Sequence, residues 1–230
     1  MAPFGRVYSY PNNYRVLRLH VLAALNDLTL EDAPDFQVGV TNRTPEFLAK
    51  FPLGKVPAFE SGDGTLHLTE GQAIARYVAE SGPRAAQLLG DPEDTTTRAL
   101  VEQWACFATQ ELEANLTPSL LMCMYKLVPY DETRYAHHVA AYERALGALE
   151  AAVSGPGGEK KKKFLVGERL TLADVMVAGV LQLATRVLVD AEMRKVLPGV
   201  EAYLKGIMEL PEMRVAFPPL ELCEVRAKGQ

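Results

Sequence analysis

The sequence predicts a small α/β domain at the N-terminus followed by an all-helical domain. Strand-like and helix-like segments alternate over residues 1–82, a pattern that indicates an α/β unit. From residue 93 onward the apolar residues follow the helical period, and no segment there has the pattern of a strand. We therefore place the first domain at residues 1–82, a linker at 83–92 and the helical domain at 93–230.

The first domain begins with a strand, a helix and a strand. Residues 6–10 have strand composition, residues 14–25 carry apolar side chains at the helical period, and residues 28–31 form a short second strand. Because a helix joins the two strands, we expect them to be parallel, with a right-handed crossover. Thr44 and Pro45 suit the N-cap and the first position of a short helix that follows.

Residues 55–77 form the most informative stretch. The run 56–59 is a short apolar strand that contains Pro57, a residue with no amide to donate to a sheet. A turn at 61–64 leads into a returning strand at 65–68, and Glu70 opens a helix. The free N–H groups of that helix favour a carboxylate or phosphate nearby. The order of elements is that of a thioredoxin-like sheet.

The sequence predicts that the second domain is a series of helices. Glycine and proline at 82–83 and 90–92 bracket the linker. Pro118 predicts a kink in the first long helix. The loop at 154–163 ends in four lysines, which we expect on a solvated surface. The predicted helices cover residues 93–127, 131–153, 175–189, 192–208 and 211–217.

Thr171 and Asp174 precede the most apolar helix of the chain. Threonine followed three residues later by an acid is a variant of the capping box, with Asp in place of the usual Glu or Gln. We expect Asp174 to be buried beside free backbone N–H groups and to have a structural role.

Composition limits the classes of function. The chain has 230 residues, 48% of them hydrophobic and 23% charged, as in ordinary globular proteins. A net charge of -5 argues against nucleic acid as the main partner. No apolar run reaches the roughly 18 residues of a membrane span, and no signal-peptide pattern is present. We therefore expect a cytoplasmic protein without a membrane partner.

The three cysteines, Cys106, Cys123 and Cys223, are far apart in the sequence. Their number and spacing argue against a disulfide framework and against a zinc site, so no metal is expected. Cys106 and Cys123 lie in apolar helical stretches, where we expect buried structural thiols.

Taken together, these features resemble the cytosolic glutathione transferase family, and the resemblance covers nearly the whole chain. It is carried by the thioredoxin-like half, the helical half, the Lys55-Val56-Pro57 hairpin, Glu70 at a helix start and the Thr171-to-Asp174 box. Residues 41–48, 51–59, 164–169 and 222–224 are most similar to the transferase-like N-terminal domain of the gamma subunit of translation elongation factor 1. The resemblance implies the glutathione transferase fold, with glutathione as substrate or cosubstrate.

The resemblance also implies residues that bind glutathione. Val56, before a Pro57 that we expect to be cis, would pair through its backbone with the cysteinyl unit. Lys55 would meet the glycyl carboxylate, with Asn42 and Arg43 nearby.

At the start of the following helix, Glu70 would face the ammonium group of the γ-glutamyl unit, and Gly71 would lie at its carboxylate. Many transferases have serine at the position of Gly71. The missing hydroxyl contact corresponds to about 1.5 to 3 kcal/mol when its partner is charged, while the backbone N–H groups remain. The alternative for Glu70 is an ordinary acid at a helix N-terminus.

A transferase must also keep the thiol of glutathione ionised, and the family uses Tyr, Ser or Cys after the first strand. The candidates here are Tyr8, Ser9, Tyr10, Asn12 and Asn13, with Tyr10 near the usual serine position and Asn12 just beyond it. An amide N–H can also donate to a thiolate. Tyr8 is expected to point into the core, and the choice among the donors stays open.

The second substrate, a small electrophile, would lie between the domains. Four residues at helical spacing could line its pocket: Leu116, Leu120, Met124 and Tyr125. The alternative is that these side chains belong to the core.

Two functions follow. The first is a glutathione transferase that conjugates or isomerises an electrophile, similar to stand-alone fungal relatives in secondary-metabolite pathways. The second is a non-catalytic module of the elongation factor gamma subunit, with the nucleotide-exchange subunit as its partner. The motifs favour the module, and the chain length favours the enzyme if 230 residues are the whole protein. We also expect a homodimer across the region of Arg76 and Trp104.

Overall fold

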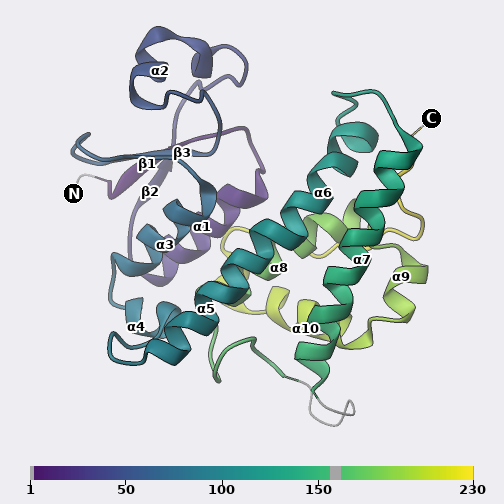
Figure 1. Ribbon diagram of the computed structural model, residues 1–230. Coiled ribbons are helices and arrows are strands. Elements are labelled where there is room, and N and C mark those ends of the chain that lie inside the picture. Colours follow the sequence, from purple (N-terminus) through teal and green to yellow (C-terminus); the bar gives the residue numbers. More distant parts are fainter. Residues whose placement is uncertain (1–2, 156–161, 230) are drawn as a thin grey trace.

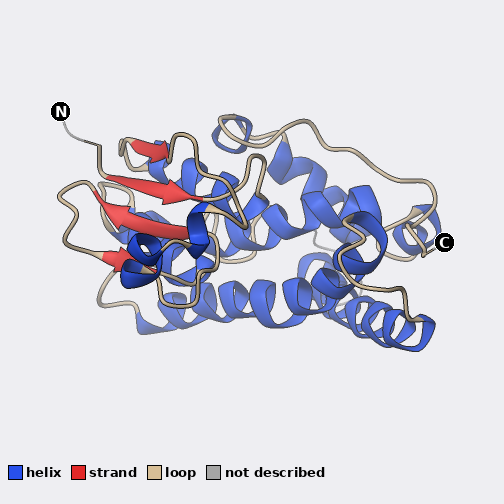
Figure 2. Cartoon of the chain, turned by 90° about the horizontal axis from the view of Figure 1, so that it is seen from above, coloured by secondary structure: helices blue, strands red, loops and turns tan. Residues whose placement is uncertain are grey.

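The computed structural model describes residues 3–155 and 162–229. Figure 1 shows a small α/β domain beside a helical domain, and Figure 2 shows the strands gathered at one end of the molecule. The predicted fold class, a thioredoxin-like domain followed by a helical domain, is confirmed.

The first domain is built on a four-stranded mixed sheet in the order β2-β1-β3-β4. Strand β1 pairs in parallel with β2, whereas β3 is antiparallel to both β1 and β4, as the strand-helix-strand and hairpin patterns predicted. Helices α1 and α3 lie together on one side of the sheet, and α2 lies on the other (Figure 1). The bounds are β1 Gly5–Tyr8, α1 Tyr14–Leu25, β2 Leu30–Asp32, η1 Thr41–Arg43, α2 Pro45–Lys50, β3 Ala58–Ser61, β4 His67–Leu68 and α3 Gly71–Glu80.

The second domain consists of helices, and α8 lies at its centre. All residues of α8 are buried except Arg186. The bounds are α4 Ala85–Leu89, α5 Thr95–Phe107, η2 Ala108–Glu113, α6 Ala114–Ser119, η3 Leu120–Met124, α7 Glu132–Ser154, α8 Leu172–Val187, α9 Ala191–Lys195, α10 Pro198–Met208 and α11 Pro211–Arg214. None of the helices in the described part of the chain is long and apolar enough to cross a bilayer.

One hydrophobic core runs through both domains, because α1 of the first packs against α8 of the second. Gly179 on α8 allows this close approach. A Cβ atom at that position would lie only 2.6 Å from Nε of Arg18 on α1. A side chain there would push α1 away from α8.

The face of the sheet toward α2 carries a second, smaller cluster of aromatic residues. Tyr8 is half-buried there, edge-on to the rings of Phe36 and Phe47. Its hydroxyl donates to Oε2 of Glu60 at 2.5 Å. Tyr8 therefore packs inward, as expected, but in this small cluster.

Three details of the helices differ from the sequence-based expectations. Residues 83–92 contain α4, whose Leu88 and Leu89 are buried. The helix predicted over 192–208 is two helices, α9 and α10, and Pro198 begins the second. The long helix with Pro118 changes to π-helical winding in η2 and again in η3, directly after α6.

The prediction of a buried thiol at Cys106 is wrong. Cys106 is exposed on α5, and Cys123 and Cys223 are half-buried. The apolar stripe of α5 faces the core through Val101 and Ala105 instead. Of the four lysines, Lys160 and Lys161 lie outside the described residues, and the other two are exposed.

Candidate functional site

A cavity of about 870 Å³ lies between the two domains. Its walls come from α1, residue 55 and the start of α3 on one side, and from α5, η2 and α6 on the other. Sites for small molecules in proteins commonly have volumes of about 300 to 1,000 Å³ and lie between domains. This cavity is therefore the candidate site.

The hairpin side of the cavity is formed by residues that the sequence singled out. Lys55 lines it, and the Val56–Pro57 peptide bond is cis. Glu70, the N-cap residue of α3, is exposed and has φ of 65°, a conformation that is uncommon for a residue other than glycine and is found at binding sites. Gly71 follows with its backbone N–H in the first turn of α3.

The structure has room for a side-chain Cβ atom at the position of Gly71. A Cβ atom there would lie 3.7 Å from both Cδ of Arg15 and Cγ of Pro57, which are ordinary van der Waals distances. These distances also show that Arg15, which lines the cavity with Gly71, and Pro57 both lie beside Gly71.

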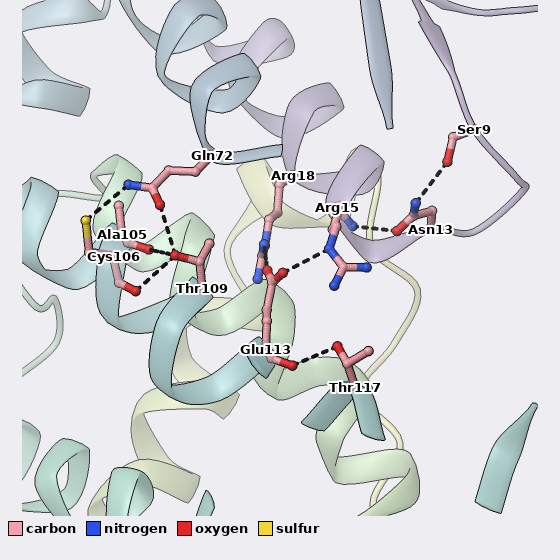
Figure 3. A network of polar contacts seen from close by, with 10 residues as sticks. All are labelled: Ser9, Asn13, Arg15, Arg18, Gln72, Ala105, Cys106, Thr109, Glu113 and Thr117. Carbon is pink, nitrogen blue, oxygen red and sulfur yellow. Dashed lines mark hydrogen bonds and ion pairs between the residues drawn. The ribbon is translucent and has the colours of Figure 1, made fainter. Parts of the chain in front are cut away.

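Two arginines of α1 and one glutamate of η2 form an ion-pair cluster across the domain boundary (Figure 3). Nε of Arg15 donates to Oε2 of Glu113 at 2.9 Å, and Nη1 of Arg18 donates to Oε1 of the same carboxylate. Burial alone would raise the pKa of Glu113, but Arg18 and Arg15 outweigh it and hold that pKa below its ordinary value. Glu113 is therefore the anionic partner of two cations.

Local structure explains how this cluster forms. Asn13 caps α1, since its Oδ1 accepts from the backbone N–H of Arg15 at 3.1 Å and its Nδ2 donates to Oγ of Ser9 at 2.9 Å. Arg15 and Arg18 are three residues apart, so they lie on one face of the helix. Glu113 ends the π-helical segment η2, a type of winding that is frequent at functional sites.

A second polar network joins α3 to α5 and η2. Nε2 of Gln72 donates to Oε1 of Glu102 at 2.7 Å, and Oγ1 of Thr109 donates to Oε1 of Gln72 at 2.9 Å. Arg76 pairs with Glu102 at 2.8 Å. These contacts fix the start of α3, where Glu70 and Gly71 lie, against the second domain.

Asn42 and Arg43 do not line the cavity. Asn42 is buried, and its side chain accepts from the N–H of Gly39 and donates to the carbonyl of Gly54, each at 2.6 Å. Asn42 thus holds the loop that leads to Lys55. Arg43 is exposed.

The candidate thiol donors are in different environments. Ser9 is half-buried, and its Oγ accepts from Nδ2 of Asn13. Asn13 is buried and occupied as the cap of α1, whereas Asn12 is exposed with φ of 58°. Tyr10 is half-buried, and burial, with a smaller contribution from Tyr125, raises its pKa to about 12. A phenol with so high a pKa is a weak donor to a thiolate.

The predicted pocket for the second substrate is corrected in part. Leu116 and Leu120 are 0% and 4% exposed and belong to the core, so the alternative reading holds for them. Their stripe on α6 and η3 faces inward, toward the core that contains α7. Met124 and Tyr125, by contrast, are about two-fifths exposed, at 41% and 42%.

Arg15, Arg18 and Glu113 were not among the site residues predicted from the sequence. Two arginines three residues apart on a mostly apolar helix were a signal that could have been used. The sequence around Glu113 contains no such signal, because its partner Arg15 is 98 residues away.

The predicted dimer region carries Trp104, which is half-buried with its ring 5.1 Å from that of Phe107. The homodimer stays a prediction. In the described part of the chain, no group of three or more His, Cys, Asp or Glu side chains is placed to hold a metal ion.

Comparison with known proteins identifies the family. The family model for the N-terminal domain of glutathione S-transferases matches residues 3–80, and that for the C-terminal domain matches residues 107–211. Glutathione S-transferase-like protein LUC7 of a Fusarium species is 42% identical over 98% of this chain and 98% of its own length. Human elongation factor 1-gamma is 34% identical over 97% of this chain and 48% of its own length.

Solved structures share the fold. The GST-like domain of elongation factor 1-gamma from Saccharomyces cerevisiae superposes with a TM-score of 0.81, at 20% identity and 100% coverage of both chains. A glutathione S-transferase-I bound with lactoylglutathione gives a TM-score of 0.75 at 25% identity, over 94% of this chain and 98% of the other. The chain belongs to the glutathione S-transferase family.

Proposed function

We propose that this protein is a glutathione transferase that acts on an electrophilic small molecule. The observation that carries the proposal is the cavity, in which Lys55, Glu70 and the start of α3 lie on one wall. Glutathione carries a carboxylate at each end and one ammonium group. A cation, an anion and a free helix N-terminus match these three charges.

In this proposal the extended backbone of glutathione pairs with Val56, and its thiol points toward the start of α1. The thiolate would attack the electrophile, either to conjugate it or to isomerise it through a transient adduct. The fungal transferase-like relative, similar over its full length, supports an enzyme. By the same resemblance we propose an intermediate of a secondary-metabolite pathway as the electrophile and the cytoplasm as the location.

The test of the proposed function is binding to immobilised glutathione together with turnover of 1-chloro-2,4-dinitrobenzene, a general electrophile for such enzymes. Retention on the resin and formation of the conjugate would support a transferase. Failure to bind glutathione would contradict it.

Replacing Glu70 with alanine is expected to weaken glutathione binding about 10- to 100-fold, because the ammonium group of the ligand loses a charged hydrogen-bond partner. Isothermal titration calorimetry measures the dissociation constant directly. Glu46 offers a matched control, since it is an exposed glutamate in the first turn of α2 and does not line the cavity. Equal affinities of the Glu70→Ala variant and the wild type would mean that Glu70 is only a helix-start acid.

Gly71→Ser is a second variant to be measured by the same titration. The space around Gly71 accepts a Cβ atom, so the serine can add a hydroxyl contact to the γ-glutamyl carboxylate without displacing a neighbour. We expect tighter binding, by about tenfold. Weaker binding would show that the carboxylate lies elsewhere.

A second candidate function is the non-catalytic module of the elongation factor gamma subunit, which the similarity to elongation factor 1-gamma supports. The chain spans about half the length of that relative. Under this candidate the partner is the nucleotide-exchange subunit. Stable co-purification with that subunit, without turnover of any electrophile, would favour the module over the enzyme.

A further inference from the structure

The proposed transferase needs a group that keeps the thiol of glutathione ionised, since a free thiol has a pKa of about 8.5. Several of the residues expected to keep the thiol ionised are limited as donors. Asn13 is used as a helix cap, Asn12 is exposed, and Tyr10 has a raised pKa. A cation near the start of α1 would add to the stabilisation that these residues can give the thiolate.

Arg15 lies where such a group would be needed. Its Cδ is 3.7 Å from the Cβ position of Gly71, and Pro57 meets the same point. In the proposed binding mode the cysteinyl unit pairs with Val56, next to Pro57, and the γ-glutamyl carboxylate lies at Gly71, so Arg15 is within reach of both groups. Arg15 also lines the cavity, and its side chain is 26% exposed.

Glu113 fixes how the guanidinium of Arg15 is oriented. The carboxylate of Glu113 accepts a hydrogen bond from Nε of Arg15 at 2.9 Å. The two terminal nitrogens of Arg15 have no hydrogen-bond or ion-pair partner among residues 3–155 and 162–229. In Figure 3 no dashed line leads from either of these nitrogens, whereas Nε is joined to Glu113. The N–H groups that remain are thus available to a ligand.

We propose that the guanidinium group of Arg15 binds the sulfur of glutathione and stabilises its thiolate, which makes Arg15 a catalytic residue. The assignment rests on the proposed glutathione transferase function and names the group that activates the nucleophile. A cation with N–H donors favours the ionised thiol through charge and hydrogen bonding.

The reaction needs no reactant other than glutathione, the electrophile and water. The thiol proton passes to solvent water, and Arg15 keeps its own protons. With 1-chloro-2,4-dinitrobenzene, a sulfur lone pair forms the C–S bond at the ring carbon that carries chlorine. The C–Cl bond then breaks, and chloride leaves with the bonding electrons.

Glu113 is a positioning residue in this scheme. Arg18 allows Arg15 to be replaced without leaving Glu113 unpaired. Arg18 is 2% exposed and also pairs with Glu113. When Arg15 is replaced, Glu113 therefore keeps a counter-charge. Asn13 still caps α1 through the backbone N–H of residue 15, so substitutions at Arg15 should leave the fold intact.

The experiment compares Arg15→Gln, Arg15→Lys and wild type by the ultraviolet absorbance of the bound thiolate as a function of pH. We expect Arg15→Gln to raise the apparent pKa of the bound thiol by about 1 to 2 units. At pH values below the thiol pKa of this variant, its kcat/KM with 1-chloro-2,4-dinitrobenzene should be about 10- to 100-fold lower than that of the wild type. Arg15→Lys keeps the charge and should recover part of both values. Arg144, exposed on α7, provides a control as Arg144→Gln.

The outcomes separate the two proposals. If wild type binds glutathione and Arg15→Gln leaves the thiol pKa unchanged, the role of Arg15 is overturned while the transferase function stands. A loss of affinity above tenfold in both Arg15 variants would also overturn it, because Arg15 would then bind a carboxylate of glutathione. If wild type itself does not bind glutathione, both proposals fail.

Discussion

Replacing Asp174 with alanine is expected to lower the free energy of unfolding by about 3 to 5 kcal/mol. Asp174 is 0% exposed at the start of α8. Its Oδ1 accepts from the N–H of Leu165 at 2.8 Å and from the hydroxyl of Tyr203 at 3.0 Å. Its Oδ2 accepts from the N–H and the hydroxyl of Thr171, each at 3.0 Å. Alanine would leave all four donors buried without a partner.

Chemical denaturation followed by circular dichroism measures this loss, and Asp94 provides the matched control. Asp94 caps α5 through a bond from the N–H of Thr97 at 2.9 Å and is exposed. An exposed cap of this kind contributes about 1 kcal/mol. If Asp174→Ala destabilised the protein no more than Asp94→Ala, the buried network around α8 would have no special importance.

The elements that could be predicted from the sequence are those fixed by local chemistry. The capping box at Thr171 and Asp174 marks the start of α8 within one turn, and both of its bonds are present. Pro57 and Glu70 fix the hairpin and the start of α3 in the same way. These signals lie within a few residues of the feature that they specify, which is why they suffice.

Features that depend on distant contacts could not be predicted in this way. Leu116 and Leu120 form an apolar stripe that has the same spacing whether it lines a cavity or fills a core, and they fill the core. The exposure of Cys106 depends on which face of α5 meets α8. The pairing of Arg15 with Glu113 joins residues that only the packing of the two domains brings together.

The pairing across the domain boundary leads to the second large effect. Glu113→Ala is expected to destabilise the protein by about 3 to 5 kcal/mol, because Arg18, at 2% exposed, would be left buried without a counter-charge. Urea denaturation gives the value. Glu31→Ala is the matched control, since Glu31 and its ion-pair partner Arg6 are each 45% exposed and such pairs contribute at most about 1 kcal/mol. Similar losses in the two variants would mean that the buried cluster adds nothing beyond a surface pair.

The pH dependence of this loss provides an independent check on the charge of Glu113. Its pKa is lowered in the folded protein, because Arg18 and Arg15 outweigh the opposing effect of burial. A lowered carboxyl pKa stabilises the folded state fully above the unfolded value, about 4.3 for glutamate, and the stabilisation is lost as the pH falls through the folded value. The difference in unfolding free energy between wild type and Glu113→Ala should therefore be constant near neutral pH and shrink on acidification below about pH 4.3. A difference that stayed the same at low pH would show that Glu113 acts through packing, because only the ionised carboxylate can balance the two arginines that join α1 to η2.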